Sequence, residues 1–174
     1  MITKEQLKQI MIYASQANIE KFHGPLVDTM ATYFIDTPVR MAMFLAQLAH
    51  ESGCLKYVQE IADGKAYEGR KDLGNVLSGD GVRFKGRGLI QITGRANYTH
   101  LSKDFGVDFI ANPWLIEQPQ YAALTAGWFW NKNNLNQWCD KNDFKTLTKR
   151  INGGYNGLAD REKYLERAKK VFSL

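Results

Sequence analysis

The sequence has little cysteine, and it has no long apolar run, no internal repeat and no low-complexity segment. Its two cysteines, Cys54 and Cys139, cannot form the disulfide framework of a small secreted scaffold, and they show no metal-ligand spacing. We therefore expect two reduced packing thiols, no metal and no cofactor. No apolar run approaches the roughly 20 residues that cross a bilayer. The first residues also lack the apolar core of a secretory signal, so we expect synthesis in the cytoplasm and release by another agent.

The composition is that of a globular protein. Of the 174 residues, 44% are hydrophobic, 24% are charged and 12% are aromatic. This length suits one catalytic domain over residues 1–174, with room for two lobes and without a separate wall-binding domain. We expect a monomer. The net charge of +5 favours contact with polyanions, but it does not choose among nucleic acid, a membrane surface and an anionic cell wall.

The spacing of apolar residues predicts a mostly helical chain. Thr3 and Gln6 can form a capping box at the first helix, and Thr37 with Pro38 has the pattern of an N-cap and a first helical residue. The expected helices cover residues 3–20, 25–35 and 38–51, then begin near Tyr98, after Pro113, after Pro119 and after Asp143, and end with 158–172.

A glycine-rich segment over residues 61–97 interrupts this helical pattern. Its only strand-like pieces are residues 82–84 and 89–93. A long loop or a small β-ribbon is therefore expected here, and loops of this length usually carry function.

Glu51 is the strongest candidate for a catalytic group. It follows the apolar stripe of the third helix, where desolvation would raise the pKa of its carboxyl group and suit it to a general acid. If the helix stops at Gly53, the chain can turn and bring Glu60 back across a groove. Two carboxyl groups about 6.5 to 9.5 Å apart, with water between them, are the arrangement of an inverting glycosidase.

Four motifs resemble glycoside hydrolase family 19, in its phage-endolysin and bacterial chitinase-like branch. The resemblance spans about residues 38–172. The motifs are Ala49-His-Glu-Ser-Gly53, Ala66-Tyr-Glu-Gly-Arg70 with Asp72-Leu-Gly-Asn75, Phe84-Lys-Gly-Arg-Gly-Leu-Ile-Gln-Ile-Thr-Gly-Arg-Ala-Asn-Tyr98, and Ile151-Asn-Gly-Gly154 with Asp160-Arg161.

The resemblance implies a mainly α, lysozyme-like, two-lobed helical domain, with a small β-ribbon or glycine-rich insert lining the cleft. It implies that Glu51 protonates the glycosidic oxygen, that Glu60 activates water and that Thr93 positions that water. It also implies cleavage of β-1,4 links next to N-acetylglucosamine-type sugars, with inversion. The substrate-binding set that it implies is Gln91, Asn97, Tyr98, Asn152 and Arg161, the last two of which would support the carboxylates from behind.

The identity of the base has an alternative in Glu68. This residue could instead form a structural ion pair with Arg70 or Arg87, and we prefer Glu60. The segment between Glu51 and Glu60 is also short beside plant chitinases, which favours a more open cleft and leaves chitin specificity open.

Several other features have an ordinary structural interpretation. A lone His50 is expected to be a satisfied structural residue. The run Phe84-Lys-Gly-Arg-Gly lacks the Lys-Ser/Thr of a phosphate loop. Trp128 is expected in the core, whereas Trp114, Trp130 and Trp138 stay open. The basic final helix could touch anionic membrane or lipopolysaccharide, but Glu162 and Glu166 dilute its charge and favour an ordinary surface helix.

The leading hypothesis is an endolysin that hydrolyses peptidoglycan glycan strands, lyses bacteria and reaches the wall through a holin. Chitin hydrolysis and a lytic transglycosylase, which uses one carboxylate and no water, are alternatives within enzymes. A non-catalytic protein that binds the wall or perturbs the membrane is a third. Nucleic-acid binding ranks last, because the basic residues are scattered among acids.

Overall fold

A computed structural model describes all of residues 1–174, which form two compact units. The first comprises residues 1–56 and 127–174, and the second comprises residues 57–126. The chain is mainly α, as the sequence predicts. No helix combines the length and the apolar character needed to span a membrane.

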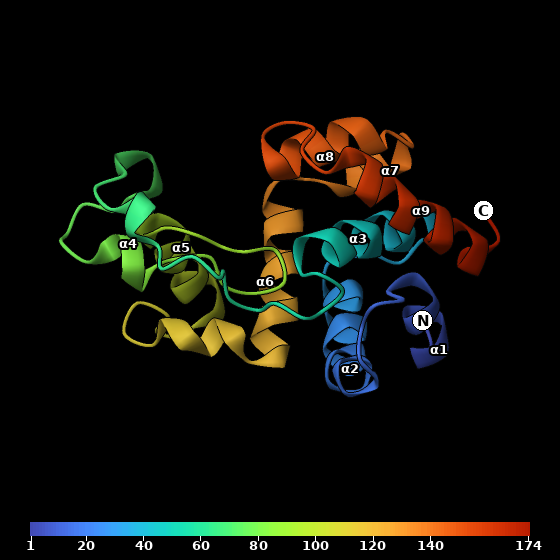
Figure 1. Ribbon diagram of the computed structural model, residues 1–174, viewed down its shortest axis with the longest axis horizontal. Coiled ribbons are helices and arrows are strands. Elements are labelled where there is room, and N and C mark those ends of the chain that lie inside the picture. Colours follow the sequence, from blue (N-terminus) through green and yellow to red (C-terminus); the bar gives the residue numbers. More distant parts are fainter. The chain divides into compact units, whose positions relative to one another are not determined.

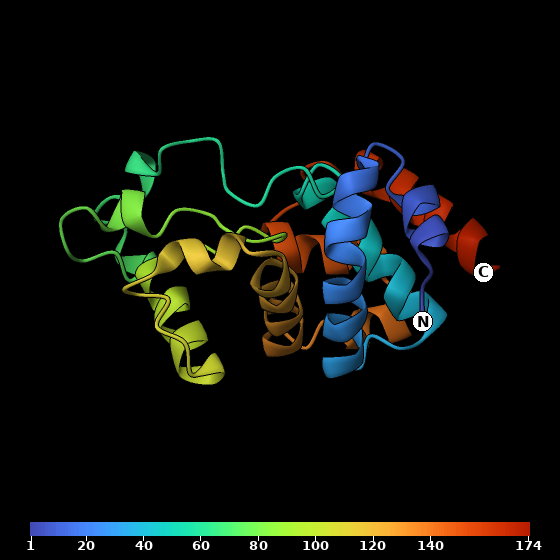
Figure 2. The ribbon, with the colours of Figure 1, turned by 90° about the horizontal axis from the view of Figure 1, so that it is seen from below.

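The first unit is built around α3 (Pro38–Glu51), whose residues 42–49 are all buried. Helix α9 (Leu158–Phe172) packs along α3 through its buried Tyr164, Leu165 and Ala168 (Figure 1). Helix α1 (Lys4–Ile10) contacts α9, and the two lie side by side in both views (Figure 2). The apolar face of α9 is thus covered by protein, as expected of an ordinary surface helix. The remaining helices of this unit are α2 (Gln16–Thr32), α7 (Asn136–Asp140), α8 (Phe144–Asn152) and the C-terminal part of α6 (Pro119–Lys132).

The second unit is irregular and contains short helical pieces. Its longest helix is α5 (Arg95–Phe105), and α6 begins in this unit. The others are α4 (Asp80–Arg83) and the 3-10 turns η1 (Lys65–Tyr67), η2 (Lys71–Leu73) and η3 (Pro113–Glu117).

Two helix predictions near the N-terminus are wrong. The expected helix over 3–20 breaks after Ile10, because the Lys8 ammonium donates to the carbonyls of Ile12 and Ala14, and Ser15 then caps α2. Pro25 does not open a helix but lies inside α2. The preceding Gly24 has no Cβ to clash with the proline ring, which makes this position tolerable.

Of the two forms expected for the glycine-rich insert, the long loop is confirmed and the β-ribbon is wrong. Residues 82–84 belong to α4 and its C-terminal end, and residues 89–93 form no strand. Only two isolated antiparallel bridges occur, Gln59 with Arg87 and Arg87 with Ile92. Gln91 has a φ of 59°, in the left-handed region, which interrupts any extended run. The glycine-rich insert is therefore a set of loops pinned by side chains, without a β-ribbon.

Candidate active site

Glu51 is the last residue of α3, as the sequence predicts. The Thr37 hydroxyl caps the helix by accepting from the Arg40 N–H at 3.2 Å. At the other end, the Ser52 hydroxyl donates to the Leu48 carbonyl at 2.6 Å and accepts from the Leu55 N–H at 2.9 Å. Gly53 then takes a φ of 56°, and the chain turns away. Helix α3 is therefore capped at its start, and the Ser52 hydrogen bonds fix the turn directly after the Glu51 carboxylate.

A buried arginine from α9 holds the Glu51 carboxylate. An Arg161 nitrogen lies 2.6 Å from Glu51 Oε1, and the Arg161 side chain is only 1% exposed while that of Glu51 is 19% exposed. A guanidinium at this distance fixes the direction in which the carboxylate points. The sequence predicts Arg161 as a support for a carboxylate, and this ion pair is the contact through which it can act.

Behind Arg161 lies a polar chain that the sequence reading missed. Gln47, which is fully buried, accepts from Arg161 at 2.6 Å through Oε1 and donates to the Thr148 hydroxyl at 2.9 Å. Thr148 in turn donates to the Phe144 carbonyl at 2.9 Å. The available signal was Gln47 itself, a polar residue in an apolar stripe and one turn before Glu51. The chain fixes the guanidinium that faces the acid.

His50 has the structural role expected of it. Its Nδ1 lies 2.7 Å from Asp160 Oδ2. Gly157, with a φ of 71°, packs against the ring, and a Cβ there would lie 2.3 Å from the imidazole. The imidazole is therefore held by α9 and the loop before it.

Glu60 lies in the second unit, where two donors hold its carboxylate. The Tyr67 hydroxyl donates to Oε1 at 2.9 Å and the Gly86 N–H donates to Oε2 at 2.7 Å. Hydrogen bonds donated to a carboxylate stabilise its ionised form, which a general base requires. Burial and the bond to Glu60 raise the pKa of Tyr67, so this donor keeps its proton near neutral pH. A Cβ at Gly86 would lie 2.9 Å from both Glu60 Oε2 and Gln91 Oε1, so a larger residue here would displace these two side chains.

The residues predicted to hold water and sugar lie in the same unit. The Thr93 hydroxyl donates to the Gln91 carbonyl at 3.0 Å, and the Asn97 amide donates to the Thr93 carbonyl at 2.9 Å. The Gln91 amide donates to the Gly88 carbonyl at 3.0 Å. All three side chains are partly exposed. In each of these hydrogen bonds the side chain is the donor, so its oxygen can still accept a hydrogen bond from a ligand. The roles of Thr93 in holding water and of Gln91 and Asn97 in binding sugar stay predictions.

Tyr98 does not contact substrate, which corrects the sequence prediction. It is fully buried, donates to the Lys85 carbonyl at 2.7 Å and accepts from Arg87 at 3.0 Å. Burial raises its pKa to about 12. Its role is to hold the backbone beside Gly86. Arg161 is likewise buried and faces Glu51, so it is no direct sugar ligand.

Asn152 lies exposed at the C-terminal end of α8. Its side-chain oxygen accepts from the Asn156 N–H at 3.3 Å, which shapes the loop that follows. Its predicted support of a carboxylate stays a prediction.

Glu68 has a structural role, but with other partners than expected. Its carboxylate accepts from the N–H groups of Gly79 and Gly81, at 2.6 and 2.8 Å, beside the start of α4. The predicted ion pairs are wrong, because Arg70 pairs with Asp72 and Arg87 pairs with Glu117. Both Glu68 oxygens thus accept from backbone N–H groups, and the preference for Glu60 over Glu68 as the base stays a prediction.

The cysteines and tryptophans are accounted for by packing. Cys54 and Cys139 are buried and free, and burial raises the pKa of the Cys139 thiol to about 12. Trp128 is in the core, as predicted. Trp130 is also buried and meets the Phe44 ring edge-on at 5.0 Å. Trp114 is 55% exposed and available to stack on a sugar.

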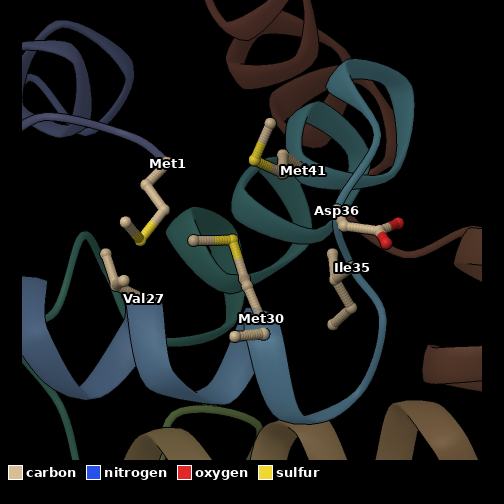
Figure 3. Close-up of a pocket in the computed structure, with 7 residues that line it drawn as sticks. Met1, Val27, Met30, Ile35, Asp36 and Met41 are labelled. Carbon is tan, nitrogen blue, oxygen red and sulfur yellow. The ribbon is translucent and has the colours of Figure 1, made fainter.

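A small apolar pocket lies elsewhere in the first unit and contains none of these site residues (Figure 3). It has a volume of about 130 Å³ and only one carboxylate. No three histidine, cysteine, aspartate or glutamate side chains gather so that they could hold a metal ion. The pocket is lined by Met1, Val27, Met30, Ala31, Ile35, Asp36 and Met41.

Comparison with known proteins shows the family of the chain. The glycosyl hydrolase family 19 described as chitinase class I matches residues 36–143. A glycosyl hydrolase family 19 domain-containing protein of Haemophilus influenzae is 33% identical over 154 residues, which cover 71% of this chain and 75% of the relative. An Arabidopsis thaliana endochitinase is 37% identical over 118 residues, or 66% of this chain, but the match spans only 39% of that plant relative.

Two solved structures share the fold. The class IV chitinase from Zea mays superposes with a TM-score of 0.80 at 21% identity, covering 99% of this chain and 93% of that one. Chitinase C from Streptomyces griseus gives 0.78 at 22% identity, covering 99% and 76%. At this identity the likeness concerns the fold alone.

Proposed function

Because the chain belongs to glycoside hydrolase family 19, a family of glycosidases, we propose that it hydrolyses the β-1,4 bonds of peptidoglycan glycan strands by an inverting mechanism. Glu51 is the general acid and Glu60 the general base. The observation that carries this assignment is the different support of the two carboxylates. Glu60 accepts two hydrogen bonds from uncharged donors, whereas Glu51 is 19% exposed and is oriented by Arg161.

The acid step begins with the protonated form of Glu51, which transfers its proton to the glycosidic oxygen as the bond to the leaving sugar breaks. The carboxylate that results is stabilised by the Arg161 guanidinium at 2.6 Å. Arg161 thus favours the product of proton transfer. Since the guanidinium is fixed by Gln47, it need not reorient during the step.

The base step uses the ionised form of Glu60, which takes a proton from the attacking water. Thr93 positions that water, and Gln91 and Asn97 bind hydroxyl or acetamido groups of the sugar. The hydrogen bonds from Tyr67 and Gly86 hold the Glu60 carboxylate in place while it takes this proton. Glu51 then regains a proton and Glu60 loses one to solvent, which completes the cycle.

The choice of peptidoglycan is supported by charge. The chain has a net charge of +5, which favours an anionic wall over neutral chitin. In this proposal the protein is a lysis enzyme of phage or prophage type, acts as a monomer and reaches the wall through a holin. Chitin is the second candidate substrate, because the plant relatives are named as endochitinases.

The test is lysis of outer-membrane-permeabilised Gram-negative cells by the purified protein, with new reducing ends counted. Glu51→Gln keeps the shape of the side chain but removes its acid, and the expected loss of rate is about 10² to 10⁴-fold. The matched control is Glu162→Gln, an exposed glutamate on α9, which should keep full activity. Undiminished lysis and reducing-end formation by Glu51→Gln would refute the assignment.

Three further measurements separate the alternatives. Activity on N-acetylglucosamine oligomers but not on peptidoglycan would identify a chitinase. Product mass spectrometry distinguishes hydrated sugar ends, which we expect, from the anhydro ends of a lytic transglycosylase. Killing that survives Glu51→Gln but not removal of residues 158–174 from a still folded chain would identify a non-catalytic membrane-perturbing protein.

A further inference from the structure

Helices α7 and α8 carry four cations that the acid and base chemistry does not use. All four are exposed, and none forms an ion pair with a carboxylate. With two aromatic residues they form a surface that we call the α8 basic face. Its members are Lys141, Lys145, Lys149, Arg150, Trp138 and Tyr155.

The cations of this face lie against the aromatic rings. The ammonium groups of Lys145 and Lys149 lie 5.1 and 5.9 Å from the centre of the Tyr155 ring. Tyr155 is 47% exposed. Lys141 and Arg150 flank the Trp138 ring in the same way, at 4.8 and 5.6 Å. An aromatic ring can stack on a sugar, and a neighbouring ammonium can bind an anionic group on that sugar.

The carboxylates nearest in sequence are already occupied. Asp140 binds Arg40 through both oxygens, at 2.7 and 2.6 Å. Asp143 caps α8 by accepting from the Thr146 N–H at 2.9 Å. No acidic residue occurs between Asp143 and Asp160. After the hydrogen bonds from Thr146, the charges of Lys141 and Lys145 also lower the pKa of Asp143, so this carboxylate offsets part of the positive charge of the face. The charge that remains is open to a ligand.

The α8 basic face adjoins the acid half of the candidate site. Thr148, on the buried side of α8, contacts Gln47, which orients Arg161 against Glu51. The loop that follows α8 carries Tyr155 and, two residues later, Gly157, which packs on the His50 ring beside Glu51. The segment between α8 and α9 thus joins Tyr155 of the basic face to the residues that pack beside Glu51.

We propose that the α8 basic face binds carboxylate groups carried by the glycan strand, so that an acidic amino-sugar polymer is preferred over a neutral one with the same linkage. This inference rests on the proposed function, whose substrate class it specifies. Lys145 and Lys149 bind the carboxylates while Tyr155 packs against the sugar. Such contacts act mainly on affinity and weaken as salt rises.

The experiment measures binding by co-sedimentation with purified peptidoglycan sacculi, in the Glu51→Gln background so that nothing is cleaved. Sacculi with free carboxylates are compared with sacculi whose carboxylates have been amidated. The test variant is Lys145→Gln with Lys149→Gln. The control is Lys163→Gln with Lys170→Gln, two exposed lysines of α9. In this background, whose net charge is +6 because Glu51→Gln removes one acid, each pair lowers the net charge by two, to +4.

The test pair should weaken binding to sacculi with free carboxylates about fivefold at low salt and should leave binding to amidated sacculi unchanged. The control pair should keep its affinity for both. Three results would overturn the inference. The first is an equal loss of affinity in both pairs, which would indicate an effect of net charge alone, and the second is an equal loss of affinity for amidated sacculi. The third is stronger binding through Lys145 and Lys149 to phosphatidylglycerol vesicles than to sacculi. Failure of the proposed function appears separately, as absence of turnover by the unmutated chain.

Discussion

Glu51 and Glu60 are held by chemically different partners. Arg161 gives Glu51 a fixed cation, whereas Tyr67 and Gly86 give Glu60 two neutral donors. The sequence identifies both glutamates and predicts Arg161 as a support. It does not identify Tyr67, because a tyrosine seven residues after a glutamate has no characteristic spacing. Only the folded loop brings the hydroxyl to Oε1.

Replacement of Tyr67 by phenylalanine should lower kcat/KM about tenfold, because a hydrogen bond to a charged group contributes about 1.5 to 3 kcal/mol. The half-buried ring remains, so the thermal midpoint should change little. Tyr13→Phe removes a hydroxyl from a residue that is 74% exposed and serves as the control. An unchanged rate in Tyr67→Phe would show that the hydroxyl does not support the base.

Thr148→Val should destabilise the fold by about 1 to 3 kcal/mol, because it removes the hydroxyl that accepts from the buried Gln47 amide. Thr148→Ser keeps that hydroxyl and should retain most of the stability. Urea denaturation of both variants gives the comparison. Activity should fall further in the valine variant, since Gln47 then orients Arg161 less well. Equal stability and equal rates in the two variants would contradict this role.

The four-residue helix α4 depends on one buried carboxylate for its place. Asp80 accepts from Arg95 at 2.6 and 2.8 Å and from the N–H groups of Val76 and Leu77 at 3.1 and 3.0 Å. Its side chain is only 2% exposed. These hydrogen bonds, those from Arg95 first, lower the pKa of Asp80. The segment that the sequence suggests as a strand is thus anchored as a helix.

Asp80→Asn should cost about 2 to 4 kcal/mol of unfolding free energy at pH 7, because it leaves the Arg95 guanidinium without its anion. The folded pKa is lowered, so the contribution of Asp80 is complete above about pH 4. It is lost as the pH falls through the lower folded value. The difference from the unmutated chain should therefore shrink below about pH 4. Urea titrations at pH 7 and pH 3 measure it, and a difference of equal size at both would be the contrary result.

Elements with a strong local signal could be predicted from the sequence, and those held by distant contacts could not. Helix α3 has an N-cap, a proline at its first position and an apolar stripe, and α9 has the predicted bounds, Leu158–Phe172. The break after Ile10 depends on the Lys8 side chain and Ser15, and α4 depends on Arg95, 15 residues away. Such contacts leave no periodic pattern in the sequence.

At the scale of the whole molecule, the family and the two candidate glutamates could be inferred from short motifs, but the networks behind them could not. The match over residues 36–143 confirms the family. The motifs cannot show that Gln47 and Thr148 orient Arg161, since the residues that meet there lie 101 and 114 positions apart. The role of a residue within a motif is also not fixed by the motif, as the burial of Tyr98 shows.

The central claim is that Glu51 and Glu60 act as acid and base in a single displacement by water. The direct test is proton NMR of the first products released from a β-linked glycan oligomer, recorded before the anomers equilibrate. If the mechanism inverts, the new reducing end appears first as the α-anomer, and Glu51→Gln abolishes the signal. A β-anomer formed first, or an anhydro end with no reducing anomer, would contradict the account.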